Sequence, residues 1–329
     1  MPGSRRIVTI AALALTAALL SACAAESPGA APTPPSGGAA TKTVASAYGD
    51  VEVPTDPQRV AAVSYDTPWQ LMSVDVVPIA TIDYSRWIAD YSADQQDFIA
   101  DAAMIGTYGE INFEALTAAT PDLIIGDAFE VDEATFTRLQ TIAPTVIVGG
   151  DDRGDWQSIT EQTAEATGTL EVWAEGKAAY EQLRDETKAT YADVIAAHTW
   201  INFSFGDDTG QFSVQLPSGS TGNLVVEEMG MQYGAGAQLD DPDGRGYASR
   251  PLEQLPTVFE DVTFALTFAT QDGQIHSGIR DIIDTEIFQT LAVAKDDAIY
   301  GMTTTVTDYR TARDWIVELT ENVLEPLSS

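Results

Sequence analysis

Residues 112–125, N-F-E-A-L-T-A-A-T-P-D-L-I-I, contain the pattern that decides the fold. The first five of them open a short helix that has to stop before Pro121, and residues 122–125 then read as a buried strand that Gly126 ends. A further strand is expected at residues 144–148. Helices that alternate with buried strands predict an α/β architecture with mainly parallel strands.

The same alternation extends toward both ends of the chain. Before this stretch, strands are expected at residues 60–63 and 76–80, with a helix over 68–74 between them. In the second half, expected strands and helices again alternate. The strands expected there are 200–205, 212–216, 262–268 and 298–302, and the helices are 221–229, 285–291 and 309–324.

A long helix is expected over about residues 170–197, with Gly176 as its weak point. About 28 residues at 1.5 Å each span about 42 Å, which is longer than one small lobe is wide. We therefore predict two Rossmann-like α/β lobes joined by one rigid helix. The expected bounds are 47–168 for the N-terminal lobe, 169–197 for the connecting helix and 198–329 for the C-terminal lobe.

The N-terminus has the layout of a secretory signal. Two arginines precede an apolar run over residues 7–20, and L-S-A at 20–22 leads to Cys23, the one cysteine in the chain. The run is too short for a comfortable transmembrane helix. Residues 1–22 resemble a bacterial lipoprotein signal peptide, which implies that Cys23 is lipidated and that the protein is anchored at the extracytoplasmic face of the cell membrane. An ordinary signal peptide with an incidental cysteine is the alternative.

Residues 23–46 are small and rich in Pro and Gly. Because they lack large apolar side chains, they cannot offset the entropy that ordering costs, and we expect a flexible tether.

Composition excludes several classes of protein. The chain has 16 Lys and Arg against 50 Asp and Glu, a net charge of -34, with a 44% hydrophobic fraction typical of packed proteins. Such acidity argues against nucleic-acid binding, which needs a basic surface.

Catalytic and metal-binding signatures are missing from the sequence. It holds no G-x-S-x-G, P-loop, H-E-x-x-H or dinucleotide-binding motif, so we do not expect an enzyme or a bound cofactor. The two histidines are too few for a usual transition-metal site: His198 ends the long helix, and His276 is expected on an exposed loop. The acidic residues 240–244 fit a turn better than a calcium loop, because Leu239 and Arg250 stand where acids would be needed.

Aromatic residues follow several of the expected strands. In open α/β sheets, ligands bind beyond the carboxyl ends of the strands, so these side chains are candidates for the walls of one cleft between the lobes. The few arginines near the same strand ends are candidates as well. The predicted ligand-binding residues are Tyr65, Trp69, Tyr84, Arg86, Trp87, Tyr108, Phe205, Arg245, Tyr247, Arg250 and Phe268.

The order of the segments resembles that of an extracytoplasmic solute-binding protein of an ABC importer, in the class that receives iron–siderophore complexes and cobalamin. The resemblance covers about residues 47–325 and rests on G-D-V-E-V-P at 49–54, N-F-E-A-L at 112–116, T-P-D-L-I-I at 120–125 and I-A-P-T at 142–145. It implies two lobes around a rigid helix, a shallow cleft and little closure on binding. It also implies one glutamate on each lobe that docks onto permease arginines, and these resemble Glu114 and Glu253.

The ligand that the resemblance implies is a ferric siderophore, with iron carried only as part of the bound chelate. Ferric catecholates and citrate are anionic and need several cations, whereas few arginines stand near the expected cleft. A ferric hydroxamate therefore fits best. The alternatives are haem or cobalamin binding on the same fold, or a secreted hydrolase.

Overall fold

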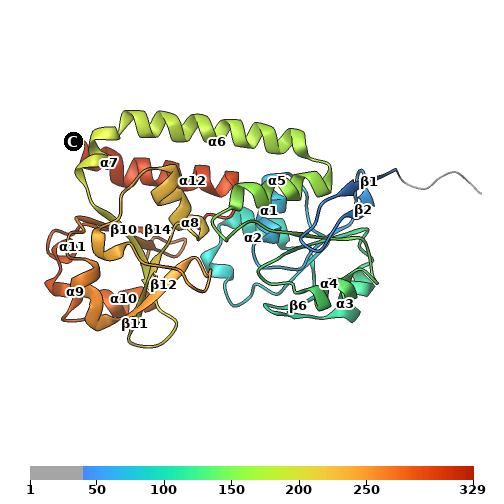
Figure 1. Ribbon diagram of the computed structural model, residues 1–329, viewed down its shortest axis with the longest axis horizontal. Coiled ribbons are helices and arrows are strands. Elements are labelled where there is room, and N and C mark those ends of the chain that lie inside the picture. The colour runs from blue at the N-terminus through green and yellow to red at the C-terminus, as the bar shows by residue number, and fades with distance from the viewer. Residues whose placement is uncertain (1–39) are drawn as a thin grey trace, which may run out of the picture. The chain divides into compact units, whose positions relative to one another are not determined.

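Two five-stranded sheets organise residues 40–329, the part of the chain that the computed structural model describes (Figure 1). The predicted lipidation site, Cys23, and most of the predicted tether lie outside the described residues. The first lobe is built around one sheet and the second lobe around the other, which confirms the α/β fold class.

The first sheet is parallel throughout. Its order is β5(Ala103–Met104), β4(Ala80–Thr81), β3(Val60–Ala62), β8(Leu123–Asp127) and β9(Thr145–Val148). Every residue of β3, β8 and β9 is buried, as expected for parallel strands that helices cover on both faces. The predicted strand at 76–80 is wrong in its bounds, because pairing with Ala61 begins only at Ala80.

Gly126 lies inside β8 and does not end it, so its predicted role as a breaker is wrong. A Cβ at this position would lie 2.7 Å from Cγ2 of Val63 and 3.0 Å from Cγ2 of Val131. The glycine is therefore needed because two side chains close over the strand.

The second sheet is mixed. Its order is β12(Tyr247–Pro251), β11(Gln211–Gln215), β10(Trp200–Phe205), β13(Phe264–Phe268) and β14(Ile299–Met302). β10, β13 and β14 are parallel, and β11 and β12 add antiparallel strands at one edge. The expected strands 200–205, 212–216, 262–268 and 298–302 correspond to β10, β11, β13 and β14.

Two short antiparallel pairs accompany the first sheet. β1(Thr41–Val44) pairs with β2(Val51–Pro54), and β6(Gly106–Thr107) pairs with β7(Glu110–Ile111). Residues 41–44 therefore belong to a strand, although the composition indicated a tether to residue 46.

The helices of the first lobe are α1(Thr67–Ser73), α2(Ala93–Ile99), α3(Phe113–Ala119), α4(Glu133–Leu139) and α5(Trp156–Thr167). Those that follow are α6(Leu170–Thr190), α7(Ala192–Ala197), α8(Ser220–Asn223), α9(Leu255–Val258), α10(Ser277–Ile283), α11(Ala292–Lys295), α12(Tyr309–Leu319) and α13(Glu325–Leu327). None of the helices described here has the length and apolar character needed to cross a bilayer.

The predicted long helix is interrupted at Tyr191, between α6 and α7. The bend turns the following residues toward the second lobe, where Ile195 is buried in the core and its carbonyl accepts a hydrogen bond from Nε1 of Trp200 at 3.0 Å. The predicted helix 221–229 also changes pitch, since α8 continues as one π-helical turn over Leu224–Glu228. Gly230 then follows with φ 72°, as expected for the residue that ends a helix.

Three aromatic side chains join the two lobes. Trp156 of α5, Tyr180 of α6 and Tyr309 of α12 are almost fully buried, and their ring centroids lie 5.1–5.5 Å apart. α6 lies along one side of both sheets with α12 beside it (Figure 1). Nε1 of Trp156 also donates to Oδ1 of Asn223 at 3.3 Å. Trp156, a side chain of the first lobe, therefore contacts both α6 and the second lobe.

Polar contacts fix the middle of α6 to the second lobe. Tyr180 donates from its hydroxyl to Oε2 of Glu228 at 2.9 Å, and Arg184 forms an ion pair with the same carboxylate. Lys188 donates to the Glu228 carbonyl. Because Glu228 and Arg184 are only partly exposed, their hydrogen bonds contribute more to stability than those of an ion pair on the surface.

We predict that Trp156→Ala lowers the free energy of unfolding by about 3–5 kcal/mol, since it leaves a cavity between three elements. Trp156→Phe keeps a ring and loses the hydrogen bond to Asn223, so its cost should be about 1–2 kcal/mol. Urea unfolding followed by circular dichroism measures both. Equal costs for the two variants would contradict the role of ring packing.

Candidate functional site

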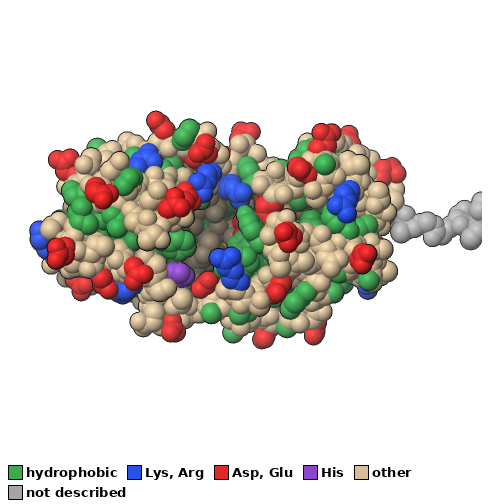
Figure 2. Space-filling view, turned by 90° about the horizontal axis from the view of Figure 1, so that it is seen from below, with side chains coloured by type: hydrophobic (Ala, Val, Ile, Leu, Met, Phe, Trp, Pro, Cys, Tyr) green, Lys and Arg blue, Asp and Glu red, His purple; other side chains and the backbone are tan. Residues whose placement is uncertain are grey.

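A cavity of about 590 Å³ lies where the carboxyl ends of the two sheets face each other. Figure 2 shows this hollow, with hydrophobic side chains inside it and basic side chains near its edge. From the first lobe it is lined by Tyr65, Asp66, Trp69, Arg86, Trp87, Asp90, Tyr91, Ser92 and Gln95. From the second lobe it is lined by Ser204, Phe205, Phe268, Ala269, Gln271, His276, Thr303, Thr304, Thr305, Thr307, Arg310, Thr311 and Asp314. We call it the main cavity.

The strand ends explain this lining. Tyr65 and Asp66 follow β3, and the loop after β4 carries Arg86 and Trp87. On the other side, β10 and β13 end at their lining phenylalanines, and the threonines follow β14. A site at the carboxyl ends of parallel strands is the usual one in open α/β sheets.

Aromatic rings form the first-lobe wall. The ring of Tyr65 lies 5.6 Å from Tyr84, 5.2 Å from Trp87 and 5.7 Å from Tyr108, measured between centroids. Trp69 packs behind it, with its centroid 4.5 Å from that of Tyr91. The contacts among these rings hold the wall in one arrangement before any ligand binds.

Six of the predicted ligand-binding residues line the main cavity: Tyr65, Trp69, Arg86, Trp87, Phe205 and Phe268. Tyr84 lies behind the wall, 2% exposed, with its hydroxyl bonded to the Tyr65 carbonyl. Tyr108 is 50% exposed and contacts the wall from outside.

The remaining three predicted ligand-binding residues lie on or next to β12, away from the main cavity. Arg245 forms an ion pair with Asp207 at 2.6 Å and lies over the ring of Tyr247 at 4.4 Å. Arg250 donates to the Ser249 carbonyl at 2.8 Å. Both arginines are thus held by groups of the second lobe. Their position in the sequence alone could not indicate these contacts.

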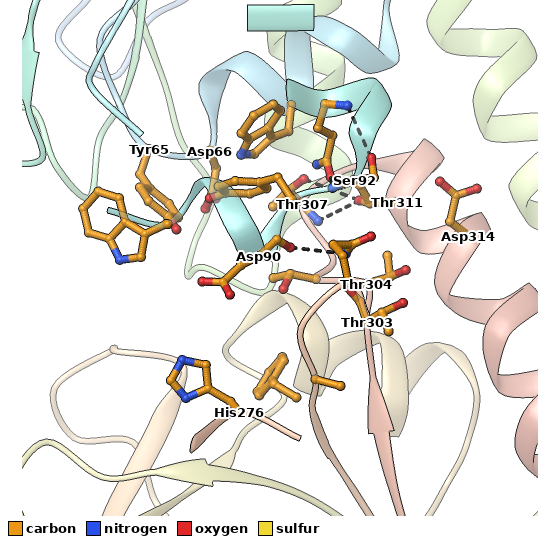
Figure 3. A pocket seen from close by; sticks show the side chains of 18 of the residues that line it. Tyr65, Asp66, Asp90, Ser92, His276, Thr303, Thr304, Thr307, Thr311 and Asp314 are labelled. Atoms are coloured by element: carbon orange, nitrogen blue, oxygen red, sulfur yellow. Dashed lines mark hydrogen bonds between the residues drawn. The ribbon is translucent and has the colours of Figure 1, made fainter. Parts of the chain in front are cut away.

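His276 lines the main cavity, so its expected place on an exposed loop is wrong. It caps α10: its Nδ1 accepts from the Gly278 amide at 3.3 Å, which leaves the proton of the neutral ring on Nε2. Its ring lies 5.3 Å from that of Phe205. Figure 3 shows His276 across the cavity from Tyr65 and Asp66. No motif marked this histidine, because its position depends on the pairing of β10 with β13.

Gln271 is a further residue that sequence reasoning missed. Its Nε2 donates to the Asp90 carbonyl at 3.2 Å and to the Thr303 carbonyl at 2.7 Å. It therefore bridges the two lobes at the edge of the main cavity. The only sequence signal was its place shortly after a predicted strand.

Acidic side chains gather beneath the aromatic wall. Burial raises the pKa of Asp66 to about 7 and that of Glu130 to about 8, and the charges of neighbouring acids add to the effect. Burial also raises the pKa of Asp127, although its carboxylate accepts from the Phe129 amide at 2.6 Å. Arg153 opposes all three shifts. Within residues 40–329, no group of three or more His, Cys, Asp or Glu side chains is placed to hold a metal ion.

The two predicted docking residues are exposed. Glu114 stands in the first turn of α3, whose Asn112 cap accepts from two backbone amides at 3.1 Å. Glu253 lies in a short 3₁₀ turn, Leu252–Gln254, directly after β12.

The sequence matches the family described as periplasmic binding protein over residues 60–305. The chain belongs to this family. Its members are extracytoplasmic solute-binding proteins and not enzymes, which excludes the hydrolase alternative, and the fold described above is that of their class III.

Individual relatives agree with this assignment. The iron(3+)-hydroxamate-binding protein FhuD of Bacillus subtilis is 27% identical over 88% of this chain and 87% of its own length. The ferric enterobactin-binding periplasmic protein FepB of Escherichia coli is 32% identical, but over only 39% of this chain and 42% of its own length. A solved siderophore periplasmic binding protein from the fuscachelin gene cluster of Thermobifida fusca has a TM-score of 0.68 at 22% identity, over 82% of this chain and 97% of that one.

We predict that stability falls as pH rises from about 4 to about 8. In this window the folded protein holds protons on Asp66 and Glu130 that the unfolded chain, with pKa values of about 3.9 and 4.3, has released. Asp66→Asn and Glu130→Gln should each shrink the fall in Tm between about pH 5 and about pH 9 by about 2–4 °C. Calorimetric scans measure this, with the exposed Asp101→Asn as control. A fall in Tm that neither Asp66→Asn nor Glu130→Gln reduces would contradict it.

Proposed function

We propose that the protein captures a ferric siderophore of the hydroxamate type in the main cavity and delivers it to an ABC importer. One observation carries the ligand class: a rigid aromatic wall faces a second wall of Phe205, Phe268 and His276, with the guanidinium of Arg86 over Trp87 of the first wall. The relative FhuD of Bacillus subtilis, an iron(3+)-hydroxamate-binding protein by its name, matches 88% of this chain, which supports the same class.

Arg86 is suited to grip hydroxamate oxygens. It is exposed, stacks on the ring of Trp87 at 5.2 Å, and has no carboxylate within 4.0 Å among the described residues. A guanidinium without an acidic partner keeps its donors available to ligand oxygens. The stacking contact holds it near the wall.

The charge of the main cavity disfavours anionic chelates. Arg310 lines it but contacts Asp94 at 3.3 Å, and three acids line it as well: Asp66, Asp90 and Asp314. A catecholate or citrate complex would need several unpaired cations here. A neutral or cationic hydroxamate complex meets no such repulsion.

Delivery requires a membrane anchor and a docking surface. We propose that Cys23 carries the lipid and that Glu114 and Glu253 contact arginines of the permease. Both glutamates are exposed on surface turns or helices, as that role demands. The iron arrives and leaves as part of the chelate and is cargo.

We predict that ferrioxamine and ferrichrome quench the tryptophan fluorescence of the protein with tight binding, because Trp69 and Trp87 line the main cavity. Ferric enterobactin and ferric citrate should bind more weakly by at least about tenfold. Preferential binding of these two would overturn the hydroxamate assignment. A coloured protein after incubation with haem, without siderophore quenching, would favour a haem-binding protein.

Variants locate the binding site in the same titration. Phe205→Ala and Arg86→Met should each weaken ferrioxamine binding by about tenfold, since each removes about 1–2 kcal/mol of ligand contact. The exposed Arg280→Met, outside the cavity lining, is the matched control. Unchanged binding in both cavity variants would place the ligand elsewhere.

We predict that Glu114→Arg combined with Glu253→Arg lowers siderophore uptake by cells that carry the cognate importer by about tenfold or more. The chelate affinity of the purified variant should stay unchanged, because neither residue lines the cavity. Glu133→Arg, an exposed acid on neighbouring α4, controls for added positive charge. Normal uptake by the double variant would contradict the docking role.

A further inference from the structure

A second cavity of about 150 Å³ adjoins the main cavity. Asp66 and Thr307 line both, so the two spaces meet at these residues. Gln70, Asp127 and Arg153 also line the second cavity. Its volume is about that of five water molecules, enough for a short arm of a ligand whose core fills the main cavity.

Two side chains that line the second cavity, Asp66 and Gln70, have acceptor oxygens to which no described group donates a hydrogen bond. Among the described residues, no protein group donates to the carboxylate of Asp66, which also takes part in no ion pair. Gln70 is 2% exposed, and its Oε1 has no hydrogen-bond partner. A buried acceptor left unpaired is destabilising, so a ligand that donates a hydrogen bond here restores the missing interaction.

Positive charge is scarce at the same place. Arg245 lines the second cavity but forms its ion pair with Asp207. Arg153 lies over the ring of Phe129 at 4.9 Å and faces Asp66, Asp127 and Glu130 together. Three acids thus share one guanidinium that is within 4.0 Å of none of them, and a cation bound at the junction favours their ionised forms.

We propose that Asp66 and Gln70 form a subsite for a primary ammonium group, carried on the arm of a chelate whose iron centre lies in the main cavity. An ammonium supplies three donors, a positive charge and no acceptor, which is what the unpaired carboxylate and amide oxygen lack. The ring of Tyr65 lines the main cavity beside Asp66 and adds attraction for a cation (Figure 3). The subsite rests on the proposed function and narrows the ligand to amine-bearing hydroxamates.

The test compares ferrioxamine B, which has a free amine, with its N-acetylated form, which has the same hydroxamate core and no charge. Fluorescence titration of the wild-type protein should show at least about tenfold tighter binding of the amine form. Asp66→Asn should remove this preference and leave the affinity for the acetylated form within about threefold. Asp101→Asn, at an exposed acid that lines neither cavity, is the matched control and should keep the preference.

Each outcome decides the proposal. Equal binding of the two forms by the wild type overturns the subsite while the proposed function stands, and the wild-type comparison holds even if a variant fails to fold. A preference that survives in Asp66→Asn, or that Asp101→Asn removes, also overturns it. Binding of neither form overturns the proposed function itself and the subsite with it.

Discussion

The packing of Trp156, Tyr180 and Tyr309 is the contact on which the geometry of the molecule depends. Each ring belongs to a different helix. Helix α5 belongs to the first lobe, α12 to the second lobe, and α6 links the two lobes. Aromatic rings bury large apolar areas and prefer a few relative orientations, so the junction fixes the angle between the lobes as well as holding them together. The ion pair of Arg184 with Glu228 then fixes α6 along its length.

A fixed angle between the lobes produces the binding site. Because the carboxyl ends of both sheets face the same space, side chains from distant parts of the chain form one cavity. Preorganised walls reduce the entropy that a ligand must offset on binding. The same burial removes water from Asp66 and Glu130 and raises their pKa values. The stability of the protein therefore depends on pH through these two acids.

The sequence predicts most of the frame, since strands such as 123–127 and 145–148 are apolar throughout and bounded by strong helix and turn signals. It could not predict that Gly126 lies within a strand, because the reason is the approach of Val63 and Val131 from other segments. Nor did any local pattern indicate the bend at Tyr191, which depends on Ile195 reaching the second core.

The sequence predicts those lining residues of the main cavity that directly follow a strand. That rule found the aromatic wall and Phe205, but not His276 or Gln271, whose places follow from sheet order. It also selected Arg245, which forms an ion pair with Asp207, 38 positions earlier in the sequence, a pairing that only the folded chain brings about. The scarcity of basic residues, by contrast, was visible in the composition, and it supports the proposed ligand class.

A crystal structure of the protein with a bound ferric hydroxamate tests the central claim most directly. We expect the iron centre between Trp87 and Phe205, contacts from Arg86 to hydroxamate oxygens, and two sheets that keep the mutual orientation described here. A chelate bound outside the main cavity, or a rotation of one sheet about α6 that dissolves the Trp156 junction, would contradict the account.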